Sequence, residues 1–159
     1  MYARDHALIA TPIGAIRIEG DETRLTAIWI SPQGAPSPGS GPAVRDAVEQ
    51  LGQWFAGERT EFDLALSAAG TPRGAALREG LIALGYGETL SYGALARRLG
   101  SSPRAIGQAC ARNPFPILVP CHRVLGAGGA LGAYSAGDGP ATKSWLLEHE
   151  RRHAKRTML

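Results

Sequence analysis

The chain has few of the residues that mark several common protein classes. Only two cysteines, Cys110 and Cys121, occur among 159 residues, too few for the disulfide framework of a small secreted protein. The four histidines stand apart and no CxxC motif is present, so we predict no bound metal ion. Aromatic residues make up 6% of the chain, and aliphatic side chains must therefore fill most of its core.

The N-terminal segment lacks a long apolar run and carries Arg4, Asp5 and His6. This composition fits neither a secretion signal nor a membrane-spanning helix. We therefore expect a cytoplasmic protein with reduced thiols and no membrane contact. The net charge of +3 at pH 7 is compatible with a polyanionic partner but is too small to identify one.

Residues 1–70 are predicted to form a β-rich N-terminal domain. Residues 6–30 contain runs of β-forming residues separated by turns, which is the pattern of an antiparallel meander. Apolar residues then recur at helical spacing over 44–55, and an alternating run at 61–66 predicts one more short strand. Residues 68–72 are predicted to be a linker between two domains.

Residues 71–159 are predicted to be mostly helical, which makes the fold class α/β in the broad sense and α+β in detail. Ser91 is a suitable N-cap and Pro103 a suitable first helical residue, so two short helices should form a helix-turn-helix. The elements predicted in this part are helices at 73–84, 92–99, 103–112 and 141–151, a glycine-rich hairpin at 125–134, and a frayed basic tail from 151.

The sequence Pro120-Cys121-His122 sets a thiol beside an imidazole. A cysteine is a strong nucleophile as the thiolate, and a nearby base favours that form. Adjacent side chains on a regular strand point to opposite faces, so a cooperating pair must lie in a turn or at the start of a helix. An acidic third residue would orient the imidazole, with Glu150 as the best candidate and Glu148 as the alternative.

Three further residues have both a structural and a functional interpretation. Tyr92 is either a packing residue or a phenol that donates to a ring nitrogen of a purine. Tyr134 and Ser135 are either a strand end and its turn, or the lining of an alkyl pocket with a hydrogen bond to the purine oxygen.

The second helix of the predicted helix-turn-helix carries long polar side chains among small ones. Arg104, Gln108 and Arg112 alternate there with small residues that include Ala105 and Gly107. Such a helix can approach another surface closely, although tight internal packing would also explain the small residues. An enzyme that acts on a base takes it out of the stack, and Arg104 is long enough to fill the gap.

Several segments between residues 86 and 150 resemble the O6-alkylguanine-DNA alkyltransferases (methylated-DNA–protein-cysteine methyltransferases). The most specific is the block Arg112-Asn113-Pro114 followed by Val119-Pro120-Cys121-His122-Arg123-Val124. The others are Tyr86-Gly87-Glu88-Thr89-Leu90-Ser91-Tyr92-Gly93, Arg104-Ala105-Ile106-Gly107, and Trp145-Leu146-Leu147 with His149-Glu150. The first 70 residues match the family only in layout.

The resemblance implies a direct-reversal DNA repair enzyme that acts once. Cys121 would accept the alkyl group from O6-alkylguanine, and also from O4-alkylthymine, while His122 takes the thiol proton through water and Glu150 holds the imidazole. No cofactor is implied. The partner would be double-stranded DNA, bound through its minor groove by a monomer in which residues 71–159 are the DNA-binding and catalytic domain.

The same resemblance assigns roles to the other residues. Asn113 would brace the active-site turn, Tyr92 would polarise the base at N3, and the Val124 carbonyl would read the exocyclic amine. Tyr134 would flank the alkyl group and Ser135 would bond O6. The DNA-contacting residues would be Arg104, Ala105, Gly107, Gln108, Arg112 and Arg123.

Three other interpretations use the same residues. A non-catalytic sensor that binds alkylated DNA and recruits excision repair would lack the acceptor cysteine, which is present here as Cys121. A cysteine hydrolase fits poorly, because its histidine is usually distant in sequence. A DNA-binding regulator would leave Cys121, His122 and Glu150 without a role.

Overall fold

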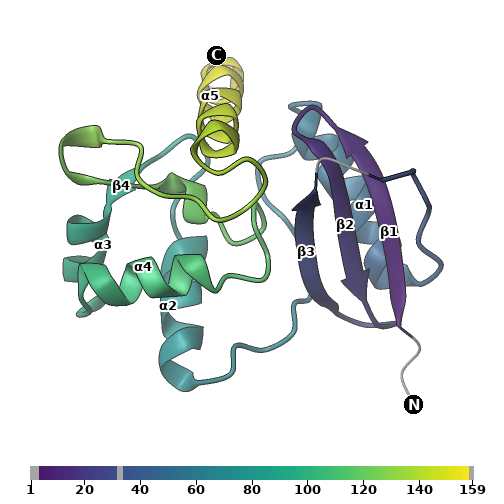
Figure 1. Ribbon diagram of the computed structural model, residues 1–159, viewed down its shortest axis with the longest axis horizontal. Coiled ribbons are helices and arrows are strands. Elements are labelled where there is room, and N and C mark those ends of the chain that lie inside the picture. Colours follow the sequence, from purple (N-terminus) through teal and green to yellow (C-terminus); the bar gives the residue numbers. More distant parts are fainter. Residues whose placement is uncertain (1–3, 32–33, 158–159) are drawn as a thin grey trace. The chain divides into compact units, whose positions relative to one another are not determined.

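The computed structural model describes residues 4–31 and 34–157. The chain divides into two compact units, Met1–Ser67 and Ala68–Leu159 (Figure 1). A small antiparallel sheet with its helix, followed by a mostly helical part, confirms the predicted fold class. In the residues described, no helix combines the length and the apolar character needed to cross a membrane.

The first unit is a three-stranded antiparallel sheet with a helix packed on it. Strands β1 (Asp5–Thr11), β2 (Gly14–Gly20) and β3 (Leu25–Ser31) lie in chain order, which confirms the predicted meander. Helix α1 (Pro42–Phe55) lies against this sheet (Figure 1). Alternate strand residues and one stripe of α1 form the core, which includes the fully buried Ile16, Ile18, Val44, Ala47, Leu51 and Trp54.

The strand predicted at 61–66 is wrong. Of these residues, Leu66 alone pairs with the sheet, through a parallel bridge to Leu25. Leu25 N donates to Ala65 O at 2.9 Å, and Ser67 N donates to Leu25 O at 2.8 Å. The alternating apolar residues therefore mark one point of attachment beside β3 rather than a full strand.

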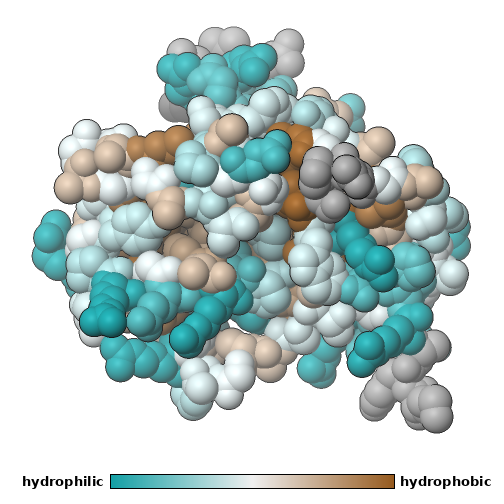
Figure 2. Space-filling view, in the orientation of Figure 1, coloured by the Kyte–Doolittle hydropathy of each residue, from teal (hydrophilic) through white to brown (hydrophobic). Residues whose placement is uncertain are grey.

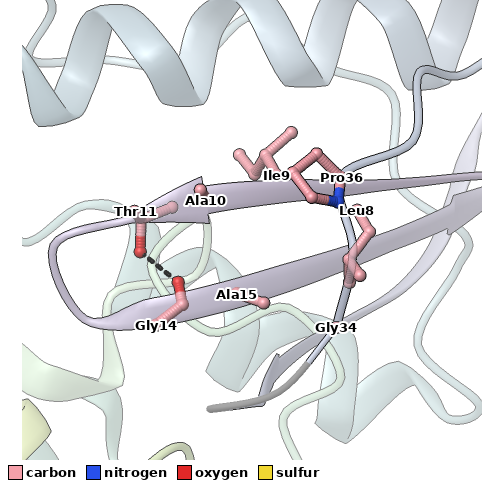
Figure 3. Close-up of a pocket in the computed structure, with 8 residues that line it drawn as sticks. All are labelled: Leu8, Ile9, Ala10, Thr11, Gly14, Ala15, Gly34 and Pro36. Carbon is pink, nitrogen blue, oxygen red and sulfur yellow. Dashed lines mark hydrogen bonds between the residues drawn. The ribbon is translucent and has the colours of Figure 1, made fainter.

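The first unit also contains a small cavity of about 160 Å³, between the β1–β2 hairpin and the segment at 34–36 (Figure 3). Its lining is mostly aliphatic. The Thr11 hydroxyl in the lining donates to Gly14 O at 2.6 Å within the turn (Figure 3). Because this hydroxyl is already engaged, the cavity offers no reactive group.

The second unit gathers helices around two short parallel strands. Its elements are α2 (Pro72–Ile82), β4 (Leu90–Ser91), α3 (Tyr92–Leu99), α4 (Pro103–Ala111), the 3₁₀ turn η1 (Cys121–Arg123), β5 (Val124–Leu125), the 3₁₀ turn η2 (Ala127–Gly129) and α5 (Pro140–Thr157). The helices predicted at 73–84, 92–99 and 103–112 are confirmed, with ends that differ by at most two residues.

Helices α3 and α4 begin and end where local hydrogen bonds dictate. Ser91 Oγ accepts from Ala94 N at 3.0 Å, and Gly100 ends α3 in the left-handed conformation with φ of 63°. The Ser102 hydroxyl caps α4, whose first residue is Pro103. The two helices pack against each other across this short turn, which is consistent with the predicted helix-turn-helix (Figure 1).

Two predictions for the C-terminal part are wrong. No hairpin forms over 125–134, because β5 pairs in parallel with β4 and the chain then turns through η2. The predicted last helix, 141–151 with a frayed tail, is instead α5, which runs from Pro140 to Thr157. The helix continues because neither glycine nor proline interrupts the segment after Pro140.

Candidate active site

Cys121 begins the 3₁₀ turn η1, directly after Pro120. It is only 5% exposed. Asn113 Nδ2 donates to Cys121 Sγ at 3.2 Å and to Val119 O at 3.0 Å. Asn113 Oδ1 in turn accepts from Phe115 N at 2.9 Å. Asn113 therefore ties together both ends of the segment that leads to the thiol.

The same segment contains a strained residue. Ile117 has a φ of 76°, in the left-handed region, which is unusual for a β-branched side chain. Its side chain is buried, and Val119 N donates to Phe115 O at 2.9 Å across the bend. Burial and this hydrogen bond offset a conformational cost of about 1–3 kcal/mol, so the turn before Cys121 has one defined shape.

His122 and Glu150 form a buried pair. The His122 Nε2 and Glu150 Oε2 atoms lie 2.9 Å apart, and the two side chains are 0% and 1% exposed. Burial lowers the pKa of His122, although Glu150 opposes this, so the imidazole is neutral near pH 7. Burial alone would raise the pKa of Glu150, but hydrogen bonds from His122 and Arg123, together with the Arg123 charge, lower it to about 2. The site thus holds a neutral base and a carboxylate.

The alternative acidic residue, Glu148, points elsewhere. Two positions along a helix rotate the side chain by roughly 200°, so Glu148 and Glu150 occupy different faces of α5. The Glu148 side chain is 43% exposed and pairs with Arg151 and Arg152. The structure places Glu150, not Glu148, beside His122.

Arg123 is buried against Glu150. Its Nε donates to Glu150 Oε1 at 2.9 Å, its Nη2 donates to Glu150 Oε2 at 2.6 Å, and its Nη1 donates to Leu84 O at 2.5 Å. With only 6% of its surface exposed, Arg123 is not available for the DNA contact predicted from the sequence. The guanidinium lies inside because its planar fork matches a carboxylate whose buried charge needs a partner.

Lys143 is a site residue that the sequence analysis missed. It is fully buried, and its Nζ donates to Val124 O at 2.6 Å and to Ala133 O at 3.3 Å. Burial lowers the pKa of Lys143. Lys143, Leu146 and Glu150 have i, i+3, i+7 spacing on α5, so the helical periodicity was the signal that could have revealed it.

The second cysteine, Cys110, lies next to the first. It occupies the last turn of α4, is partly exposed, and lies close enough to Cys121 to affect the pKa of that thiol. The proximity of Cys110, together with burial, raises the pKa of Cys121 well above its ordinary value. Cys121 is therefore a neutral thiol in the free protein near pH 7, and it needs a base in order to react.

The predicted substrate-contacting side chains differ in their distance from the thiols. Burial raises the pKa of Tyr92, and the proximity of both cysteines adds to this effect. Burial and the proximity of Cys121 also raise the pKa of Tyr134, whose buried hydroxyl has no hydrogen-bond partner in the part of the chain described. Tyr92 and Tyr134 therefore share one site with Cys121, whereas Ser135 lies exposed at the surface.

Helix α4 has an exposed polar face and an inner face near the acceptor. The exposed side chains are Arg104, Gln108 and Arg112, at i, i+4 and i+8. Figure 2 shows hydrophilic side chains gathered over α4, at the lower left of the view. Ile106 and Cys110, at i and i+4, lie on the inner side, where Ile106 is fully buried. A Cβ added at Gly107 would meet no atom within 4 Å, so the face beside Ala105 and Gly107 is open.

The structure thus gathers most of the predicted site and leaves some of it apart. The residues brought together are Asn113, Cys121, His122, Val124, Tyr92, Tyr134 and Glu150. Ser135 and the polar face of α4 lie at the surface. Arg123, which was expected to contact DNA, is buried. In the described part of the chain, no group of three or more His, Cys, Asp and Glu residues could hold a metal ion.

The chain is similar to known proteins over nearly its whole length. A family model described as 6-O-methylguanine DNA methyltransferase, ribonuclease-like domain, matches residues 6–68, and the DNA binding domain of the same description matches residues 75–152. A methylated-DNA–protein-cysteine methyltransferase of Mycolicibacterium paratuberculosis is 40% identical over 94% of each chain. A DNA base-flipping protein of Thermus thermophilus is 40% identical and covers 89% of this chain and 97% of its own.

The similarity extends to three dimensions. A crystal structure of Mycobacterium tuberculosis OGT in complex with DNA matches this structure with a TM-score of 0.81, at 40% identity and 93% coverage of both chains. The two family matches together span most of the sequence. The chain therefore belongs to the 6-O-methylguanine DNA methyltransferase family.

Proposed function

We propose that this chain transfers the alkyl group of O6-alkylguanine, and also that of O4-alkylthymine, from double-stranded DNA to Cys121 in one irreversible turnover. As a member of its family it is a methylated-DNA–protein-cysteine methyltransferase that acts in DNA repair. One observation carries the choice of residues: a thiol braced by Asn113 stands directly before a buried, neutral imidazole that Glu150 holds.

The transfer exchanges the thiol hydrogen for the alkyl group. His122 takes the Cys121 proton through a water molecule and becomes a cation beside the Glu150 carboxylate. The sulfur forms a bond to the alkyl carbon as the bond from that carbon to O6 breaks, and the electron pair moves into the base. Tyr92 donates a hydrogen bond at N3, which stabilises the leaving guanine until it is protonated. The thioether product has no hydrolysable bond, so each molecule acts once.

Arg123 supports this step through Glu150. Its guanidinium donates to both carboxylate oxygens, which keeps Glu150 ionised although it is buried. An ionised Glu150 holds the His122 ring in one orientation and stabilises the imidazolium that forms during transfer. Arg123 is therefore a positioning residue and does not itself touch the base.

The base would be read by backbone and aromatic groups near the thiol. Val124 O accepts from Lys143 Nζ and keeps a second lone pair for the exocyclic amine of guanine. The Lys143 ammonium thus holds this carbonyl in one direction. The Tyr134 ring flanks the alkyl group, and the exposed Ser135 has to turn inward to bond O6.

DNA would approach the exposed face of α4. The small side chains of Ala105 and Gly107 permit a close approach, Gln108 and Arg112 reach toward the backbone, and Arg104 fills the place of the flipped nucleotide. In this proposal residues 71–159 are the DNA-binding and catalytic domain, residues 1–70 are a separate β-rich domain, and a monomer binds through the minor groove. The cytoplasmic location stays a prediction.

Intact-protein mass spectrometry tests the proposal. The protein is incubated with a duplex containing one O6-methylguanine, and we expect the mass to rise by a single methyl group. Cys121→Ala should show no gain and should still bind the duplex, whereas the matched variant Cys110→Ala should gain the methyl group. Transfer to Cys121→Ala would refute the assignment of the acceptor. Binding of the lesion by the wild type without any gain would instead favour a sensor, in line with the name of the Thermus thermophilus relative.

A further inference from the structure

Cys110 is a nucleophilic side chain beside the acceptor that the proposed transfer does not use. It ends the inner face of α4, one helical turn after the buried Ile106, and it remains partly exposed. Cys121, in contrast, is buried. A small solute from solvent therefore meets Cys110 before it meets the acceptor.

Asn113 and Lys143 connect the two cysteines. Each thiol affects the pKa of the other, so the two sulfurs lie close together. Asn113 contacts both residues, because its backbone N donates to Cys110 O at 3.3 Å and its Nδ2 donates to Cys121 Sγ at 3.2 Å. The Lys143 ammonium lies close enough to influence both thiols. Two thiols, an asparagine bonded to the Cys121 sulfur and to the Cys110 backbone, and one nearby cation make a dithiol cluster.

We propose that this cluster is a reversible oxidation site, in which a peroxide converts Cys110 and Cys121 into an intramolecular disulfide. The bond would make the acceptor unreactive until a thiol reductant restores it. The formation of the disulfide does not depend on the proposed alkyl transfer, and only its consequence for repair does.

The chemistry balances with hydrogen peroxide as the oxidant. The Cys110 sulfur attacks one peroxide oxygen, the O–O bond breaks, and Cys110 becomes a sulfenic acid with release of one water. The Cys121 sulfur then attacks the Cys110 sulfur, the S–O bond breaks, and a second water leaves. In total two thiols lose two hydrogens and two electrons, and one peroxide is reduced to two waters.

The surroundings favour Cys110 as the first thiol to react. The proximity of Cys121, followed by the charge of Lys143, lowers the pKa of Cys110 against the opposing effect of burial. An accessible cysteine of lowered pKa next to a resolving cysteine is the arrangement typical of redox-sensitive sites. The sulfurs must still approach to about 2.05 Å, which a rotation at the end of α4 can supply.

The disulfide has a chemical advantage for a protein that works once. An isolated acceptor thiol that is oxidised proceeds from sulfenic to sulfinic acid, which thiol reductants do not reverse. Here Cys110 reacts with the peroxide first and Cys121 captures its sulfenic acid, so the acceptor enters a disulfide that a thiol reductant can reverse. Cys110 would thus preserve molecules that have not yet repaired a lesion.

Peptide mapping tests the proposal directly, because Arg112 separates the two cysteines. Trypsin cleaves after Arg104, Arg112 and Arg123, so residues 105–112 and 113–123 form two peptides that only a disulfide can join. The folded protein is treated with a slight excess of hydrogen peroxide, remaining thiols are blocked with iodoacetamide, and the digest is analysed without reductant. We expect the joined peptide, an intact mass lower by two hydrogens, no covalent dimer, and return of both free thiols after dithiothreitol.

Cys110→Ser is the matched control. The same peroxide should give no joined peptide in this variant, and Cys121 should be oxidised more slowly than Cys110 is in the wild type, because it is buried and neutral. The proposal is overturned if oxidised wild type contains sulfinic acid without the joined peptide, if the link joins two molecules, or if it forms only in urea. All of these outcomes are measured by mass spectrometry and none requires alkyl transfer. They therefore test the disulfide separately from the proposed function.

Discussion

Replacing Glu150 with glutamine removes one charge from the centre of the site and keeps the size of the side chain. In the structure its Oε2 accepts hydrogen bonds from His122 Nε2 at 2.9 Å and from Arg123 Nη2 at 2.6 Å, and the side chain is almost fully buried. Arg123 is itself buried and keeps its charge in the variant. Glu150→Gln therefore leaves a cation in the interior with a neutral amide as its neighbour.

The expected loss of stability can be worked out from the structure in two ways. The pKa of Glu150 falls from an ordinary value of 4.5 to about 2, which corresponds to about 3 kcal/mol of stabilisation at neutral pH. Breaking a buried ion pair by removing one partner typically costs about 3–5 kcal/mol. We therefore expect Glu150→Gln to lower the free energy of unfolding by about 3–5 kcal/mol at pH 7.

The pH dependence has a defined sign. A carboxyl whose pKa is lower in the folded protein stabilises fully above its unfolded pKa, and this contribution is lost as pH falls through its folded pKa. The difference between wild type and Glu150→Gln should thus be constant from pH 7 to about pH 5 and shrink as pH falls from 4.5 toward 2.

Urea unfolding followed by circular dichroism at several pH values measures this difference. Glu148→Gln is the control, because that carboxylate lies on the same helix, is 43% exposed and forms only surface ion pairs. It should change the free energy of unfolding by less than about 1 kcal/mol. Equal losses for Glu148→Gln and Glu150→Gln, or a Glu150 difference that is as large at pH 3 as at pH 7, would refute the reasoning. At temperatures where both remain folded, Glu150→Gln should also slow methyl transfer by roughly 100-fold or more, since a misplaced base loses its contribution.

Two further substitutions test the surfaces around the thiol. Gly107→Ala meets open space and should stabilise α4 by up to about 1 kcal/mol, yet weaken binding of duplex DNA in fluorescence anisotropy if α4 lies against the groove. Gly52→Ala is the control: its added Cβ also meets open space, on α1, so it should raise the melting temperature without changing DNA affinity. If Gly107→Ala binds DNA as well as Gly52→Ala does, α4 does not contact the DNA. Lys143→Met should keep the fold and slow methyl transfer about tenfold or more, because Val124 O loses a charge-assisted hydrogen bond of about 1.5–3 kcal/mol. A wild-type rate of transfer would contradict the role given to this lysine.

Features that depend on near neighbours in the chain were predictable from the sequence. Ser91 and Gly100 bound α3 through a side-chain cap and a left-handed residue, and Ser102 with Pro103 starts α4 in the same local way. The acceptor turn was also readable, because prolines and Asn113 surround Cys121 within a few residues. The antiparallel meander followed from alternation along single strands.

Features that depend on distant segments were not predictable in this way. The run at 61–66 alternates as a strand does, and the glycine-rich run at 125–134 was predicted to be a hairpin. Only the partners available in three dimensions decide whether strands form, and these were a single bridge to Leu25 and the strand β4. Helix α5 is a different case, because the absence of glycine and proline after Pro140 was readable in the sequence and the predicted end was simply too early.

The sequence by itself determined which reactive residues this protein has, the short-range turn that presents Cys121 next to His122, and the family to which it belongs. Only the tertiary structure decided how the charged residues pair. It chose Glu150 over Glu148, turned Arg123 inward as the partner of that carboxylate, buried Lys143 beside Val124, and brought Cys110 against the acceptor. The physical reason is that hydrogen bonds of caps and turns close within a few residues, whereas the partner of a buried charge or thiol is set by which helix faces pack together.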